Sequence, residues 1–173
     1  AKALVKLGDN YKKQNQDIVS KVENISGKFI DSRKNSFPGE VVSDFIQENK
    51  NYFSKLEDIA SSIFNTIQTN NRAGYSSICE YLTNKHGIEV KDVVPDEGKP
   101  FTKQFYPNEK KFVLSDYLSL ETKKLFAAAQ VAQLEANEII DEYLKSFSFP
   151  TEESKKLSKV ALLNYTGAAI IMP

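Results

Sequence analysis

The fold of this sequence is decided by LFAAAQVAQLEA at residues 125–136 and by LLNYTGAAIIMP at residues 162–173. The first stretch begins an apolar stripe at helical spacing, formed by Leu125, Ala129, Ala132, Ala136, Ile139 and Tyr143. Alanines make its other side apolar too, and a helix that is small and apolar on several faces is normally central. The second stretch closes a helix that begins near Pro150 and Thr151. We therefore predict a central helix packed against a C-terminal one.

This helix pair resembles the zinc-binding pair of the ImmA/IrrE-like metalloproteases, in which the first helix carries HExxH and the second carries a further ligand. By this resemblance, Gln130 stands at the first His, Val131 at the general-base Glu and Leu134 at the second His. The third-ligand region, near Leu162, is equally apolar. Because such a site needs two imidazoles one turn apart and a carboxylate that activates water, we expect no metal, no cofactor and no catalytic residue. A metallopeptidase is the enzyme alternative.

The degenerate pair also resembles a bacterial family, the short-chain fatty acyl transcriptional regulators. Three further segments are similar to that family in the same order, namely residues 1–18 (AKALVKLGDNYKKQNQDI), 37–60 (FPGEVVSDFIQENKNYFSKLEDIA) and 105–132 (FYPNEKKFVLSDYLSLETKKLFAAAQVA). Members carry an XRE-type helix-turn-helix, then a ligand-free IrrE-like domain, then a cysteine-bearing segment. The resemblance implies the middle segment of such a regulator, which reaches DNA only through a helix-turn-helix outside this chain.

Composition narrows the class of protein. The 173 residues include 23 basic and 23 acidic ones, and a balanced chain grips nucleic acid only where its cations cluster. A chain of this length buries roughly 70% of its extended surface, enough for one substantial core. The single Cys79 excludes an internal disulfide, and no signal peptide or apolar run of about 18 residues is visible. We expect a cytoplasmic protein without a membrane anchor.

The N-terminal part has the pattern of a helix over residues 3–29. Its apolar stripe consists of Leu4, Leu7, Tyr11, Ile18, Val22, Ile25 and Phe29. This stripe suits either packing within the fold or a dimer seam. Pro38 and Gly39 then oppose continuation of the helix. We predict a helical extension and dimerisation linker at residues 1–36, a sensing domain at residues 37–173, and a homodimer.

Within the second region the periodicity predicts helices over residues 39–68 and 76–85, the latter capped at Gly87. The period then shifts toward two, which indicates strands near residues 88–94, 101–106 and 112–114, the last two joined as a hairpin. Ser119 can cap the central helix. The final helix is expected to face inward through Leu157, Val160, Ala161, Asn164, Ala168 and Ile171. The predicted fold class is α+β, predominantly helical, with a degenerate zincin-like helix pair, a small antiparallel sheet and the N-terminal extension.

Gln130 and Gln133 are the polar residues of the central helix that need an account, because a buried amide must be hydrogen-bonded. Their partners are either groups of the protein and solvent, or a ligand. In the ligand hypothesis, the former zinc cleft has become a pocket in which the small Ala128, Ala129 and Ala132 leave room for a short acyl chain. Phe126 belongs to the same proposed site.

Cations and aromatic rings surround the sheet-to-helix region. They are Lys103, Lys110, Lys111, Lys123 and Lys124, with Phe105, Tyr106 and Tyr117. Family resemblance implies a short-chain acyl-CoA as effector, and its phosphates, adenine and thioester tail would suit this mixture. Scattered surface lysines are the alternative explanation. The proposed ligand-binding set is Phe105, Tyr106, Tyr117, Phe126, Ala129, Gln130, Gln133, Lys103 and Lys123, and the rival function is a ligand-free interaction module.

His86 and Glu135 are the two titratable residues that the sequence singles out. His86, the only histidine, lies at a predicted helix end, where an imidazolium can interact with the helix dipole. Most carboxylates are expected on solvated helix faces. Glu135 is the exception to examine, because it directly follows the vestigial ligand positions.

Overall fold

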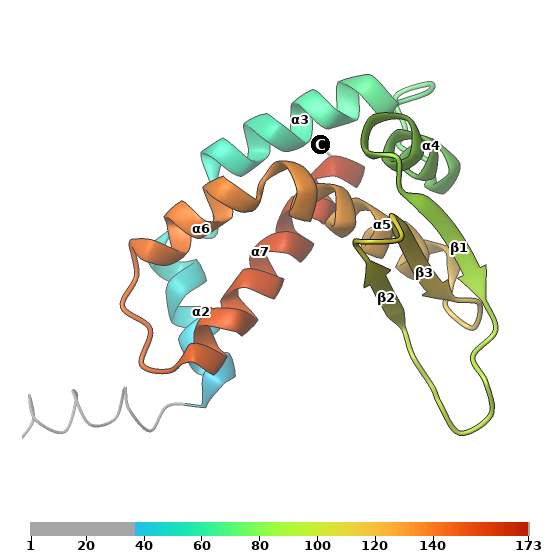
Figure 1. The fold of residues 1–173 in the computed structure, drawn as a ribbon. Coiled ribbons are helices and arrows are strands. Elements are labelled where there is room, and N and C mark those ends of the chain that lie inside the picture. The colour runs from blue at the N-terminus through green and yellow to red at the C-terminus, as the bar shows by residue number, and fades with distance from the viewer. Residues whose placement is uncertain (1–36, 173) are drawn as a thin grey trace, which may run out of the picture.

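The computed structural model describes residues 37–172 and confirms a predominantly helical α+β fold (Figure 1). The elements in chain order are α2 (Pro38–Glu48), α3 (Ser54–Ile67), α4 (Tyr75–His86), β1 (Glu89–Val93), β2 (Lys103–Tyr106), β3 (Lys111–Ser115), α5 (Leu120–Glu135), α6 (Asn137–Lys145) and α7 (Glu152–Ile171). The helical extension predicted for residues 1–36 lies outside the described residues.

The three strands form a mixed sheet in the order β1-β3-β2, so the prediction of a purely antiparallel sheet is wrong. The predicted hairpin is present, with β2 antiparallel to β3 and Phe105 opposite Phe112. However, β1 runs parallel to β3, with Val90 opposite Phe112. Strand β3 is buried through Phe112, Val113 and Leu114. Such a continuous apolar run suits the middle of a sheet, which leaves β1 at the edge opposite β2.

Two predicted helices are each divided in two. The helix expected over residues 39–68 is interrupted because Lys50 and Asn51 adopt left-handed backbone conformations, with φ of 55° and 56°. The central helix ends at Glu135, and α6 starts after Ala136, whose φ of −111° is not helical. The predicted cap of α4 is confirmed, since Gly87 has a φ of 66°.

The core consists of two apolar clusters that α3 and α7 connect. The first lies between the sheet, α4, α5 and the last turns of α3 and α7. The second joins α2, α6 and the other ends of α3 and α7, and its centre is aromatic. Phe45 of α2 stacks there on Phe147 and Phe149, each with ring centroids 5.4 Å away. Figure 1 shows α2 and α6 toward one end of α7 and the sheet toward the other.

The buried face of α7 differs from the prediction. It is formed by Ser154, Ser158, Leu162, Thr166, Gly167 and Ile170. Leu157 and Val160, expected inside, are 42% and 48% exposed. Small residues allow close backbone approach, and a Cβ placed on Gly167 would lie 2.9 Å from the Ala129 nitrogen of α5. The small face is therefore buried because α5 and α7 cross in near backbone contact.

None of the helices described within residues 37–172 is long and apolar enough to cross a bilayer.

Gly167→Ala tests the crossing of α5 and α7. The new methyl would overlap backbone atoms of Ala129, so we expect the free energy of unfolding to fall by about 1–3 kcal/mol, despite alanine's better helix propensity. Urea denaturation measures this change.

Gly39→Ala is the matched control, because a Cβ there meets nothing within 4 Å. It should leave stability unchanged or raise it by up to about 1 kcal/mol. Wild-type stability in Gly167→Ala would contradict the close crossing.

Candidate functional site

The corner between β2 and α5 brings together several predicted site residues. Lys103 and Phe105 alternate along β2 and so point to the same side of the strand. Lys103 Nζ lies 4.5 Å from the ring centroid of Phe126 on α5, and burial lowers the pKa of Lys103. The Phe105 ring lies edge-on to Phe112, with centroids 6.4 Å apart. A cation over an aromatic face is a favourable pair that fixes β2 against α5.

Gln130 lies one helical turn beyond Phe126 on the same face of α5. Its residue is 5% exposed, and its Nε2 is buried with no hydrogen-bond partner among the described residues. Gln133, in contrast, is exposed to solvent. Of the two amides singled out in the sequence, only Gln130 is therefore a buried donor that lacks an acceptor.

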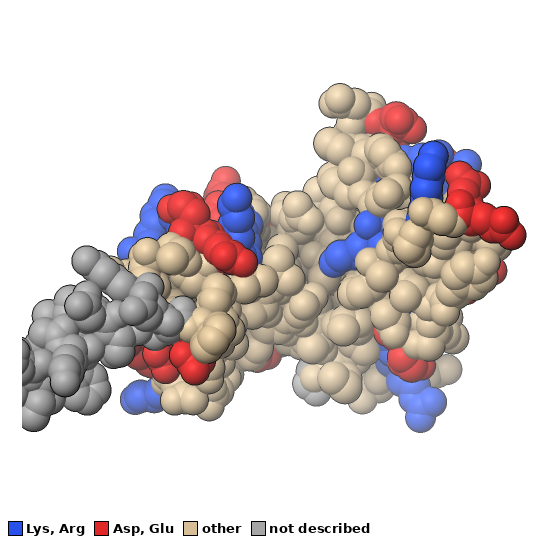
Figure 2. Space-filling model, turned by 90° about the horizontal axis from the view of Figure 1, so that it is seen from below, with Lys and Arg blue, Asp and Glu red and all other residues tan. Residues whose placement is uncertain are grey.

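Helix α7 packs against α5 at Gly167, next to the part of α5 that carries Phe126. Val160 and Asn164 share a helix face with Gly167, which contacts α5. Toward the start of α7 the same face becomes exposed at Val160 and Leu157. Seen from below, the surface is hollowed between the lobe that holds the start of α7 and the lobe that holds the sheet, and basic and acidic side chains lie on both lobes (Figure 2). This hollow is the candidate functional site.

The space beside the alanines of α5 is filled, which corrects one expectation. Ala128, Ala129 and Ala132 are at most 4% exposed, and the backbone of α7 at Gly167 lies against the first two. These small side chains therefore admit a neighbouring helix and leave no room for an acyl chain. Any ligand of this region would instead contact the neighbouring face of α5, which carries Phe126 and Gln130.

Lys123 is held in an ion-pair network at the β1 edge of the sheet. Its side chain is 9% exposed, and its Nζ lies 2.8 Å from Asp116 Oδ1 and 2.9 Å from Asp92 Oδ2. These hydrogen bonds, first to Asp116 and then to Asp92, raise the pKa of Lys123. The Tyr75 hydroxyl donates to Asp92 as well, at 2.8 Å. This arrangement favours an anchoring role for Lys123, on the edge of the sheet opposite Lys103.

The predicted tyrosines lie apart from the corner between β2 and α5. Tyr117 is 76% exposed in the turn after β3, and Tyr106 is 40% exposed at the end of β2. Tyr106 follows Phe105 and therefore points to the other side of the strand. The structure thus gathers Lys103, Phe105, Phe126 and Gln130, with Ala129 in the adjoining helix contact. Val160 was expected in the interior and not at the site, although its spacing of seven from Gly167 places both residues on one face of α7.

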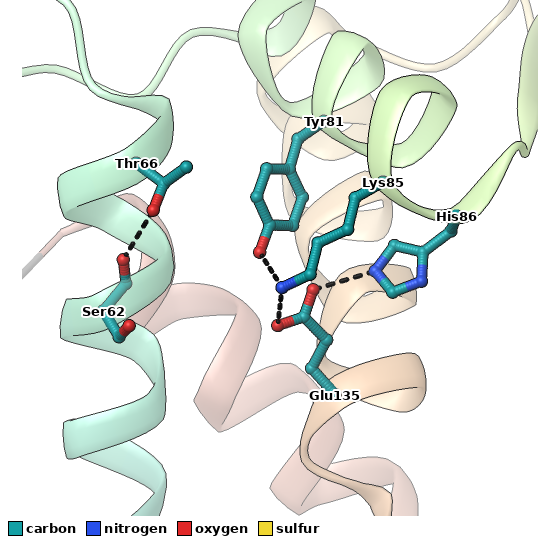
Figure 3. Close-up of polar contacts among 6 residues, drawn as sticks. All are labelled: Ser62, Thr66, Tyr81, Lys85, His86 and Glu135. Atoms are coloured by element: carbon teal, nitrogen blue, oxygen red, sulfur yellow. Dashed lines mark hydrogen bonds and ion pairs between the residues drawn. The ribbon is translucent and has the colours of Figure 1, made fainter.

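Glu135, at the end of α5, is the centre of a polar cluster with α4 (Figure 3). Lys85 Nζ donates to Glu135 Oε2 at 2.9 Å and to the Tyr81 hydroxyl at 2.7 Å. His86 Nε2 lies 2.8 Å from Glu135 Oε1. Burial alone would raise the pKa of Glu135, but the hydrogen bonds from Lys85, His86 and Tyr81 together lower it. His86 thus lies at the end of α4, as the sequence predicted, and it pairs there with the carboxylate of Glu135.

A second hollow, of about 500 Å³, lies beside this cluster between α3 and α4. Its lining is mostly polar and includes Thr66, Gln68, Ser77, Glu80, Asn84 and Lys85. Within residues 37–172, no group of three or more His, Cys, Asp or Glu side chains is placed to hold a metal ion.

Comparison with known proteins points to transcriptional regulation. No family model matches the chain. The HTH-type transcriptional regulator RamB from two Mycobacterium tuberculosis strains, CDC 1551 / Oshkosh and ATCC 25618 / H37Rv, is 25% identical over 138 residues. A solved structure described as a Mycobacterium tuberculosis transcriptional regulator matches with a TM-score of 0.70 and 22% identity, over 80% of this chain and 42% of that one.

The RamB match covers 80% of this chain but only 29% of RamB, so the chain spans less than a third of these relatives. The structural match shows that the fold occurs in a solved regulator. The similarity to RamB suggests a domain of a transcriptional regulator. The more specific resemblance to ImmA/IrrE-like domains stays a prediction.

Glu135→Gln tests the polar cluster. A carboxylate with a lowered pKa stabilises the folded state above its ordinary pKa of about 4.3, and that stabilisation disappears as pH falls through the folded-state value. We expect the variant to lose about 1 kcal/mol at pH 7, and the difference from wild type should shrink below about pH 4. Urea denaturation at several pH values measures it.

Glu138→Gln, at an exposed position in α6, is the control and should be neutral at each pH. A pH-independent loss in Glu135→Gln would show that the charge of Glu135 is not what stabilises the cluster.

Proposed function

We propose that this chain is the effector-sensing and dimerising part of an XRE-family bacterial transcriptional regulator. Residues 37–173 bind a short-chain acyl-CoA or a related fatty-acid metabolite, residues 1–36 form the dimer linker, and DNA is bound by a separate helix-turn-helix domain. The protein acts in the cytoplasm as a homodimer and performs no catalysis. Similarity to RamB supports the regulator class, and the four family-like segments support the effector class.

The single observation that carries the sensing role is the buried amide of Gln130, whose Nε2 has no acceptor among residues 37–172. A donor that is removed from water without an acceptor destabilises the empty domain. A ligand that supplies the acceptor relieves this penalty, so the occupied state is stabilised relative to the empty state. In this proposal, Phe126 and the exposed Val160 give apolar surface to a short acyl chain. Lys103, whose ammonium lies over the Phe126 ring, is the cation for the polar part of the ligand.

Helix α7 provides the route from the hollow to the N-terminal linker. One face carries Val160 toward the hollow, while another carries Tyr165 into the aromatic cluster, 5.2 Å from the ring of Phe53. Phe53 in turn packs against Phe45 of α2, with ring centroids 5.9 Å apart, and α2 begins at Pro38, shortly after residues 1–36 in the sequence. A ligand that prefers one position of α7 would therefore bias α2 and the linker, which is a population shift.

A ligand-free interaction module is the second candidate, and one observation favours it. The contact between α5 and α7 is closed at Gly167, so the pocket expected beside the alanines is absent from that place. Exposed apolar side chains such as Tyr117 and Leu120 would then serve protein contacts. This candidate predicts no binding of a small acyl ligand.

Isothermal titration calorimetry of the chain with propionyl-CoA and acetyl-CoA separates the two candidates. The sensing role predicts saturable heat with at least one thioester and weaker binding of free coenzyme A. Absence of heat with both thioesters would leave only the interaction module.

Val160→Trp places a large ring on the exposed face of α7 and should abolish that binding without unfolding the protein. Ser61→Trp, exposed on α3, is the matched control and should bind as wild type does. Undiminished binding in Val160→Trp would place the ligand elsewhere.

A further inference from the structure

Two hydrogen-bond donors that have no acceptor in the described part of the chain flank Phe126. Gln130 Nε2 is buried and has no partner among residues 37–172. The ammonium of Lys103 lies 4.5 Å from the Phe126 ring centroid. Lys103 makes no ion pair within residues 37–172. Acidic side chains pair with other lysines of the described region, including Lys55, Lys85 and Lys123. The corner therefore combines one neutral donor and one cation, and it offers no protein anion to either.

The directions of the side chains bring both donors to the same ring. Helical side chains lean toward the N-terminus of their helix, so Gln130 leans over the preceding turn, where Phe126 lies. Lys103 reaches the same ring from β2. Ser158 Oγ is the other buried polar side-chain atom without a partner in the described residues, but Ser158 is 0% exposed on the interior face of α7, away from the hollow. Gln130 is thus the buried orphan donor on the Phe126 face of α5.

We infer that Gln130 and Lys103 form a subsite for the acyl carbonyl group of the effector, a deepening that rests on the proposed function. Gln130 Nε2 donates to the carbonyl oxygen, and the Lys103 ammonium balances the charge when the ligand is a free carboxylate. The short alkyl chain then lies between Phe126 and Val160. Such a subsite accepts two sources of the same chemistry, a short-chain fatty acid and its thioester. Lys103 favours the free acid, because a neutral thioester gains less from a cation.

Titrations with sodium propionate and propionyl-CoA, followed by NMR on the whole chain, distinguish the two donors. Gln130→Leu removes the amide at similar volume and should weaken both ligands about tenfold or more, as expected for the loss of one hydrogen bond from a buried donor. Lys103→Met keeps the stem and removes the charge, so it should weaken propionate about tenfold and propionyl-CoA by less than about threefold. Gln47→Leu, on exposed α2 surface, should change neither affinity.

The outcomes separate this inference from the proposed function. Wild-type affinity for both ligands in Gln130→Leu overturns the subsite, while continued binding of propionyl-CoA to the wild-type chain leaves the sensing role standing. Failure of the wild-type chain to bind either ligand overturns both. Gln130→Leu should fold at least as stably as wild type, because it removes an unmet donor. If Gln130→Leu does not fold, Lys103→Met tests the subsite by itself. Propionate affinity equal to wild type in Lys103→Met would overturn the subsite.

Discussion

The close crossing of α5 and α7 at Gly167 is the constraint on which the rest of the structure depends. Because a Cβ there would lie 2.9 Å from the Ala129 nitrogen, only glycine permits this separation of the two backbones. The crossing closes the space beside the alanines of α5 and leaves the outer part of the same α7 face, at Val160, exposed. It also places α7 across both apolar clusters. The hollow and the mechanical connection to α2 follow from one short contact.

The side of α5 that faces α7 is held by packing, whereas the side that faces the sheet is held by ion pairs. Lys123 joins α5 to Asp92 of β1 and to Asp116 after β3, and a nearly buried ammonium with two carboxylates resists displacement, since separation would leave buried charge unpaired. At its far end α5 is tied to α4 through Glu135 and Lys85. Gln130 therefore projects from a helix held at three places, and the proposed binding role would require such rigidity.

Local signals in the sequence predicted local features of the fold. They failed for features that depend on contacts between segments far apart in the sequence. Gly87 and the cap at Ser119 occur as expected, because each needs only neighbouring residues. The parallel pairing of β1 was missed, since it depends on which strand reaches the middle of the sheet. Leu157 and Val160 were expected inside because of their apolarity, but the position of α5 selected a face of serine, threonine and glycine instead. Of the predicted site residues, Lys103 lies over the Phe126 ring, whereas Lys123 pairs with Asp92 and Asp116. Their role in ligand binding stays a prediction.

The residue at position 130 distinguishes a sensor from a scaffold on energetic grounds. Leucine would fill the same volume with no unmet donor, so packing alone disfavours glutamine by about 1–3 kcal/mol, a sizeable part of the roughly 5–15 kcal/mol that holds a domain folded. A scaffold gains nothing from this penalty. In a sensor, the penalty applies only to the empty state, because an effector carbonyl supplies the missing acceptor. The amide then contributes directly to the difference in free energy between empty and occupied domains, and only such a difference allows a ligand to shift a conformational equilibrium.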